Sequence, residues 1–165
     1  MIKFPAKVFT PEIEDADLFG TSVFLAGTIE MGNSTNWQEI AVRRLRTLPI
    51  NIFNPRRVVA PDEDKIAEQI NWELDHIASS KFIYMFLAGK SVSPISLYEL
   101  GLLQGGFASD KTVVLCCDPE YTRKMNVKVT TTHPVFVHPN IYFTHSFEGS
   151  LLRMKEEIKK SFTSA

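Results

Sequence analysis

The stretch KFIYMFL, residues 81–87, decides the fold, because it is a short apolar run that ends at the Ala88-Gly89 turn and leads into SPISLYELG, residues 93–101. Such a run predicts a strand buried on both faces, with a helix following it. The same alternation of apolar run and helical period extends along the chain. Strands are expected at residues 21–26, 50–53, 81–87, 111–117 and 135–138, and helices at residues 36–48, 62–80, 96–108 and 147–162, with residues 118–132 ambiguous.

Strands that alternate with helices predict an α/β fold, a three-layer sandwich of the flavodoxin-like or Rossmann-like type around a parallel sheet. Five strands are expected, in the order 2-1-3-4-5, which makes the first and third strands neighbours where the winding reverses. The loops after these two strands should face each other across a crevice that binds a ligand. Residues 1–20 are expected to form an extended lead-in, and residues 21–165 a single domain.

The composition narrows the classes of function. The 165 residues are 44% hydrophobic, and 18 basic against 19 acidic residues leave no basic patch for duplex nucleic acid or for an anionic membrane. No apolar run reaches the roughly eighteen residues that span a bilayer, and the first twenty residues lack the apolar core of a signal peptide. Cys116 and Cys117 are adjacent in an expected strand and point to opposite faces, which fits a reducing compartment. A cytoplasmic location is expected.

Motifs for common cofactors are missing from the sequence. There is no dinucleotide Gly-x-Gly-x-x-Gly fingerprint and no phosphate-loop lysine motif, which argues against dehydrogenases and NTPases. The four histidines show no spacing typical of metal ligands. No metal and no cofactor are therefore expected.

Glu99 lies three residues after Ser96, and two interpretations of this spacing stay open. In a capping box, the Ser96 hydroxyl and the Glu99 carboxylate would satisfy free amides at the start of the helix. In a ligand site, the carboxylate would lie at the rim of the sheet, kept ionised by the amides of the helix N-terminus and able to act as a nucleophile.

Three stretches occur together: FLAGTIEMGN at residues 24–33, NPRR at residues 54–57 and SPISLYELG at residues 93–101. In this combination the chain resembles the nucleoside 2-deoxyribosyltransferase family, including its deoxynucleotide N-glycosidase relatives, over roughly residues 21–130. The resemblance implies that Glu99 attacks the anomeric carbon of the sugar and forms a covalent glycosyl-enzyme, which a nucleobase or water then resolves. It also implies that nucleosides, nucleotides and nucleobases are the partners, and that the chain forms a homo-oligomer, a dimer or an assembly of dimers.

The resemblance also implies how the substrate is held. The family's base-holding acid lies in the helix before the third strand, where Glu73 matches and Asp75 is the alternative; both could equally be solvated helix charges. Six residues before the nucleophile, the transferases of free nucleosides often carry aspartate and the nucleotide-cleaving relatives carry serine, which is Ser93 here. Ser93 and Ser96 with the helix N-terminus could accept a phosphate, although Ser93-Pro94 also forms an ordinary turn.

Six further residues complete the expected site. Glu30 could orient a ribose hydroxyl or act on the leaving base, or it is simply a solvated loop carboxylate. Gly27 would let the backbone approach the ligand, and Arg57 could pair with Glu30, Glu99 or a phosphate. Asn126 resembles the asparagine that some family members lend to a neighbouring subunit. The expected substrate-binding residues are Gly27, Thr28, Glu30, Asn54, Arg57, Glu73, Asp75, Ser93, Ser96 and Asn126.

The first hypothesis for function is an N-glycosyl transferase or hydrolase that acts on deoxynucleosides or their monophosphates. The second is a non-catalytic nucleotide sensor on the same scaffold, which would tolerate Glu99→Ala. A more remote alternative is an NAD glycohydrolase, since related α/β folds also cleave the nicotinamide bond with a glutamate.

Overall fold

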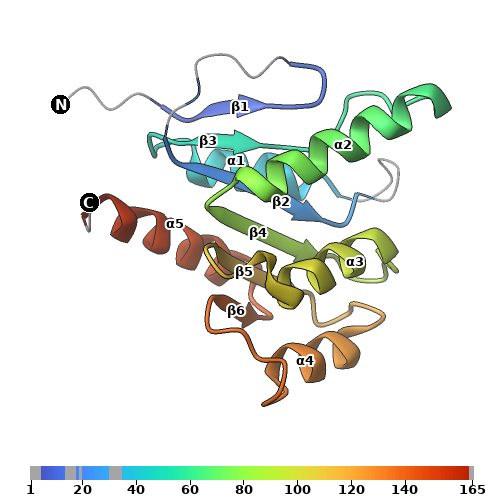
Figure 1. Cartoon of the computed structure of the whole chain (residues 1–165), viewed down its shortest axis with the longest axis vertical. Helices are drawn as coiled ribbons and strands as arrows, with labels where there is room; N and C mark the ends of the chain where they lie inside the picture. Colours follow the sequence, from blue (N-terminus) through green and yellow to red (C-terminus); the bar gives the residue numbers. More distant parts are fainter. Residues whose placement is uncertain (1–4, 14–17, 19, 30–34, 164–165) are drawn as a thin grey trace.

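A computed structural model describes residues 5–13, 18, 20–29 and 35–163 and contains a parallel sheet of six strands in the order β1-β3-β2-β4-β5-β6 (Figure 1). The π-helical turn Leu103–Phe107 extends α3. The strands are β1 Lys7–Phe9, β2 Ser22–Gly27, β3 Asn51–Phe53, β4 Phe82–Leu87, β5 Thr112–Cys117 and β6 Ile141–Thr144; the helices are α1 Trp37–Leu45, α2 Glu63–Ser79, α3 Pro94–Leu102, α4 Lys124–Thr132 and α5 Phe147–Thr163.

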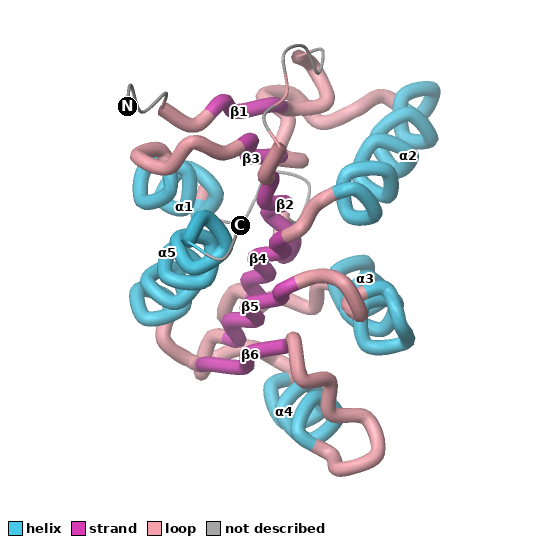
Figure 2. The backbone as a smooth tube through the Cα atoms, turned by 60° about the vertical axis from the view of Figure 1, so that its left-hand side comes forward, coloured by secondary structure: helices cyan, strands magenta, loops and turns pink. Residues whose placement is uncertain are grey.

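The sheet lies between two layers of helices, as the α/β pattern predicts. Helices α1 and α5 cover one face, and α2, α3 and α4 cover the other (Figure 2). Side chains of the central strand β4 alternate between the two cores: Ile83, Met85 and Leu87 pack with Phe24 under α2 and α3, and Tyr84 packs with the face covered by α1 and α5. All six residues of β4 are buried, which explains why its sequence is continuously apolar.

The expected number of strands is wrong, because the sheet has six strands and not five. The additional strand, β1, lies within residues 1–20 and pairs in parallel with β3, with Lys7 opposite Asn51. The other five strands, β2 to β6, lie in the relative order that was expected, 2-1-3-4-5. A three-residue edge strand leaves little apolar signal in the sequence, because only Phe9 of β1 is fully buried.

The expected position of the last strand is also wrong. Val135, Phe136 and Val137 are 75%, 59% and 54% exposed, and the strand that pairs with β5 is β6, a few residues later. The Val113 amide at the start of β5 donates a hydrogen bond to the Asn140 carbonyl at 2.8 Å, which fixes where the pairing begins. Because β-forming residues occur on both sides of the turn, propensity does not distinguish the two segments.

Helix α2 turns a different face to the sheet than its aliphatic residues suggest. The spacing of Ile66, Ile70 and Leu74 predicts the helix correctly, yet these side chains are 45%, 49% and 41% exposed. The sheet is contacted by Trp72 and His76, whose rings lie against each other and against the ring of Phe53 in tilted and edge-to-face arrangements. An aliphatic stripe on α2 is therefore left on the surface.

Among the described helices, none combines the length and the apolar character that crossing a bilayer would require.

Candidate active site

The loops that follow β2 and β4 meet at the carboxyl end of the sheet, where the winding reverses. The Thr28 and Ser93 hydroxyl oxygens lie 2.6 Å apart, and the Ser91 hydroxyl is 2.9 Å from that of Ser93. The Thr28 hydroxyl also accepts a hydrogen bond from the Ala88 amide at 3.0 Å. These buried hydroxyls join the two loops, so Thr28 and Ser93 stabilise the loop structure at the rim of the site.

Gly27 ends β2 with a φ of +129°, a conformation that L side chains rarely adopt. A Cβ atom at this position would lie 2.1 Å from the main-chain oxygen of Phe86 on the neighbouring strand. A glycine is therefore required here because the backbones of β2 and β4 approach closely, and not because of a ligand. Gly27 also forms part of the cavity wall.

A cavity of about 600 Å³ opens beside these loops, between the sheet and helices α2 and α3. Its wall is largely apolar, with a few polar side chains, which is typical of sites for small molecules. The polar side chains in the wall are Arg57, Gln69, Glu73, Ser93, Ser96 and Glu99, and the larger apolar ones are Phe24, Ile29, Val58, Ile66, Ile70, Val92 and Ile95.

Glu99 contributes a carboxyl group that is almost entirely buried, with 8% of the residue exposed. Of the two interpretations of the Ser96–Glu99 spacing, the capping box is absent: α3 begins at Pro94, so Ser96 lies inside the helix, and the N-cap residue Ser93 makes no side-chain capping hydrogen bond. Glu99 thus lies in the second turn of the helix, away from the free amides. Burial, followed by the negative charge of Glu73, raises the pKa of Glu99 to about 8, so the expectation that helix amides keep it ionised is wrong.

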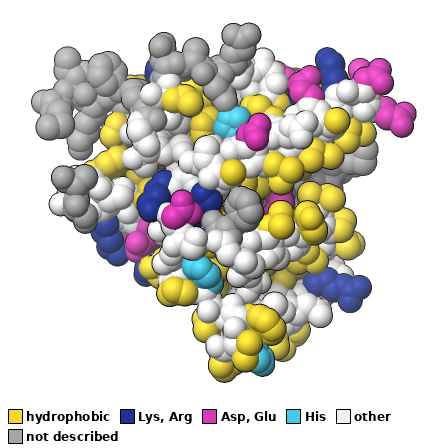
Figure 3. Space-filling view, viewed as in Figure 1, with side chains coloured by type: hydrophobic (Ala, Val, Ile, Leu, Met, Phe, Trp, Pro, Cys, Tyr) yellow, Lys and Arg dark blue, Asp and Glu magenta, His cyan; other side chains and the backbone are white. Residues whose placement is uncertain are grey.

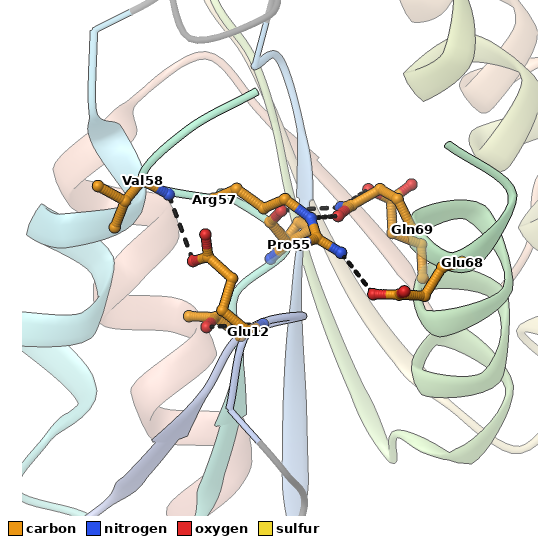
Figure 4. A network of polar contacts seen from close by, with 8 residues as sticks. Glu12, Pro55, Arg57, Val58, Glu68 and Gln69 are labelled. Carbon is orange, nitrogen blue, oxygen red and sulfur yellow. Dashed lines mark hydrogen bonds and ion pairs between the residues drawn. The ribbon is translucent and has the colours of Figure 1, made fainter. Parts of the chain in front are cut away.

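Glu73 faces the same cavity from α2 and is held by a chain of polar contacts, of which Pro55, Arg57, Glu68 and Gln69 are labelled in Figure 4. Its Oε1 accepts a hydrogen bond from the Gln69 side-chain nitrogen at 2.6 Å, and that nitrogen also donates to the Pro55 carbonyl at 2.9 Å. The Gln69 Oε1 accepts from Arg57 Nε at 2.6 Å, and Arg57 Nη2 lies 2.9 Å from Glu68 Oε1.

The surroundings of Glu73 act on its pKa in opposite directions. Burial raises the pKa of this carboxyl, while the hydrogen bond from Gln69 and the positive charge of Arg57 lower it. No hydrogen bond or ion pair within the described part of the chain reaches the Glu99 carboxyl to oppose its burial in this way. The two acids of the cavity are therefore unequal, and the proton is held more strongly by Glu99.

The remaining expected residues divide between the cavity and other surfaces. Asp75 is exposed on α2 and absent from the cavity wall, so Glu73 is the acid of this helix that faces Glu99. Asn54 uses its side-chain oxygen to accept from the Arg56 amide at 3.1 Å, and Asn126 is exposed on α4. Glu30 lies outside the described residues.

Arg57 forms its ion pair with Glu68, a partner that was not expected. Gln69, which joins Arg57 to Glu73, was likewise not singled out from the sequence. The one signal for it is its position four residues before Glu73, a spacing that places two helical side chains within hydrogen-bonding reach. Among the described residues, no group of three or more His, Cys, Asp or Glu side chains could hold a metal ion.

Comparison with protein families gives a match over residues 20–121 to the family described as nucleoside 2-deoxyribosyltransferase like. A comparison with curated proteins gives no match. The matched region includes β2, β4 and α3 and every residue of the cavity wall.

Proposed function

Because the chain belongs to the nucleoside 2-deoxyribosyltransferase-like family, we propose that it cleaves the N-glycosidic bond of deoxynucleosides or their monophosphates through a covalent glycosyl-glutamate on Glu99. The observation that carries the proposal is the buried carboxyl of Glu99 in the wall of a cavity of about 600 Å³, with a second acid, Glu73, in the same wall. Two unequal carboxyls in one apolar cavity can divide the roles of nucleophile and acid.

The first step begins with the transfer of one proton. Burial raises the pKa of Glu99 and so favours the proton on this carboxyl in the empty cavity. We propose that binding of the substrate transfers this proton to Glu73, which leaves Glu99 as the anionic nucleophile. A Glu99 oxygen then bonds to the anomeric carbon, and the bond from that carbon to the base nitrogen breaks. The electron pair of this bond goes to the base, which takes the proton from Glu73.

The second step reverses the first with a new acceptor. A nitrogen of a second nucleobase, or the oxygen of water, bonds to the anomeric carbon, and the ester bond to Glu99 breaks with its electron pair returning to the carboxylate. The proton lost by the acceptor goes to Glu73. Two inversions at the anomeric carbon give net retention of configuration.

A phosphate on the substrate would fit the start of α3. The hydroxyl of Ser96 and the first amides of the helix lie in or beside the cavity wall, and helix N-termini favour anions. Ser93 supports this region through its bonds to Thr28 and Ser91. These contacts favour a nucleoside monophosphate over a free nucleoside.

The site also supports the proposal of a homo-oligomer. Leu74 on α2 and Ile95 and Tyr98 on α3 are 41%, 65% and 67% exposed, and hydrophobic side chains gather over these helices (Figure 3). Exposed apolar surface of this kind beside a cavity is typical of an interface. Light scattering should give the mass of a dimer or a larger assembly, and Leu74→Glu combined with Tyr98→Glu should shift it toward the monomer; a monomeric parent protein would contradict this.

Intact-protein mass spectrometry tests the enzymatic proposal. Brief exposure to a panel of deoxynucleosides and deoxynucleoside monophosphates should add the mass of the sugar moiety to the protein and release the base. Glu99→Ala should abolish both, whereas Glu156→Gln, which alters an exposed acid on α5, should retain both. An added acceptor base separates transfer from hydrolysis, and nicotinamide release from NAD would indicate the glycohydrolase. No adduct and no base from any compound would favour the sensor.

A further inference from the structure

We propose that Gln69 is a positioning residue that fixes the orientation of the Glu73 carboxylate and thereby sets which of the two cavity acids receives the proton during the reaction. The proposal rests on the proposed function, because it assigns Glu73 the role of proton donor to the leaving base. Gln69 acts through Glu73 and needs no contact with the reacting atoms.

The orientation of the Gln69 side-chain amide follows from its neighbours. Arg57 can only donate hydrogen bonds, so the atom 2.6 Å from its Nε must be the amide oxygen of Gln69. The amide nitrogen then points the other way, and its two hydrogens match two acceptors, the Pro55 carbonyl at 2.9 Å and Glu73 Oε1 at 2.6 Å. Each polar atom of this side chain is thus engaged in a single arrangement.

Arg57 is a suitable anchor for this arrangement. Its side chain is only 8% exposed, and its guanidinium is held on the outer side by Glu68, whose side chain is 61% exposed. Figure 4 shows this chain of contacts from Glu68 on the surface of α2 through Arg57 to Gln69, and the Gln69 amide nitrogen continues it to the Glu73 carboxylate in the cavity. A flip of the amide would place its nitrogen against Arg57 and its oxygen against Glu73, so it is disfavoured at both ends.

The two carboxylate oxygens of Glu73 therefore have different roles. Oε1 accepts the hydrogen bond from Gln69, which leaves Oε2 to exchange a proton with Glu99 and with the leaving base. The same hydrogen bond favours the ionised form of Glu73 and so helps to keep its pKa below what burial alone would give. Glu73 is consequently prepared to accept the proton that Glu99 must lose.

Gln69→Met tests this role, because methionine has a similar length and no hydrogen-bond donor. We expect kcat to fall about 10- to 100-fold with KM changed less than about threefold, since a misplaced acid slows the step without loosening the substrate. In nuclear magnetic resonance spectra of the labelled glutamate carboxyls, assigned with Glu73→Gln, the titration midpoint of Glu73 should rise. Gln69→Glu, which keeps the shape, removes the donor and adds a like charge beside Glu73, should raise the midpoint further than Gln69→Met.

Gln104→Met is the matched control, because Gln104 is not part of the cavity wall and, among the described residues, its side chain makes a long contact of 3.4 Å to the Thr130 carbonyl. It should leave kcat and the Glu73 midpoint unchanged, and thermal unfolding should show that all variants fold. An unchanged midpoint and kcat in Gln69→Met would overturn the positioning role. Failure of the parent protein to release base would overturn the proposed function instead, and the Glu73 midpoint would still decide the role of Gln69.

Discussion

Replacing Glu99 with glutamine should stabilise the protein, and the gain should grow with pH. The carboxyl is almost completely buried, and its pKa of about 8 in the folded protein lies far above the ordinary value of 4.5. Glutamine has nearly the same shape and carries no charge at any pH. The variant therefore removes the cost of holding an ionised carboxyl in the cavity and keeps its volume.

The sign and size of this change in the free energy of unfolding follow from the linkage between proton binding and folding. Below about pH 4.5 the carboxyl is neutral in both states and costs nothing. As pH rises toward 8, the unfolded chain loses this proton and the folded chain keeps it, so the parent protein loses about 1.4 kcal/mol of stability per pH unit. Above pH 8 the loss levels off at up to about 5 kcal/mol, a large part of the stability of an ordinary domain.

Urea unfolding at pH 5, 7 and 9 measures the free energy of unfolding of both proteins. The difference between Glu99→Gln and the parent protein should widen steadily from pH 5 to 8 and then remain constant. Glu156→Gln removes an exposed acid on α5 and should show no comparable widening. A difference for Glu99→Gln that does not depend on pH would refute the assignment of a buried, protonated carboxyl at this position.

Three further predictions concern the same site and its support. Glu73→Gln should slow base release about 10²- to 10⁴-fold, the range typical of a lost general acid, and should lower the pKa of Glu99, which the titration midpoint of the Glu99 carboxyl would report. Gly27→Ala should cost several kcal/mol, about 3 or more, in the free energy of urea unfolding, because its Cβ would overlap the Phe86 oxygen; a value within about 0.5 kcal/mol of the parent would contradict this. Lys111→Met should lower the free energy of unfolding by about 1–3 kcal/mol, because the buried ammonium donates to two carbonyls at the end of α2; an unchanged midpoint in thermal unfolding would contradict this.

The fold was predictable from the sequence where a local pattern carries the signal. The apolar run of β4 reflects burial on both faces of the sheet, and the apolar period of α2 marks a helix even though Ile66, Ile70 and Leu74 stay on the surface; both elements form where they were expected. The short edge strand β1 and the strand β6 were missed or displaced, because their pairing is decided by the neighbouring strand more than by their own residues.

Sequence alone determined that the loop after β2 and the loop that leads from β4 to Glu99 would meet at the carboxyl end of a parallel sheet, because strand order fixes which loops are neighbours. Only the tertiary structure decided that Glu73 and not Asp75 faces the cavity with Glu99, that Gln69 connects Glu73 to Arg57, and that burial raises the pKa of Glu99. The physical reason is that desolvation and Coulomb interactions depend on distances between side chains on different elements. A linear spacing does not contain those distances.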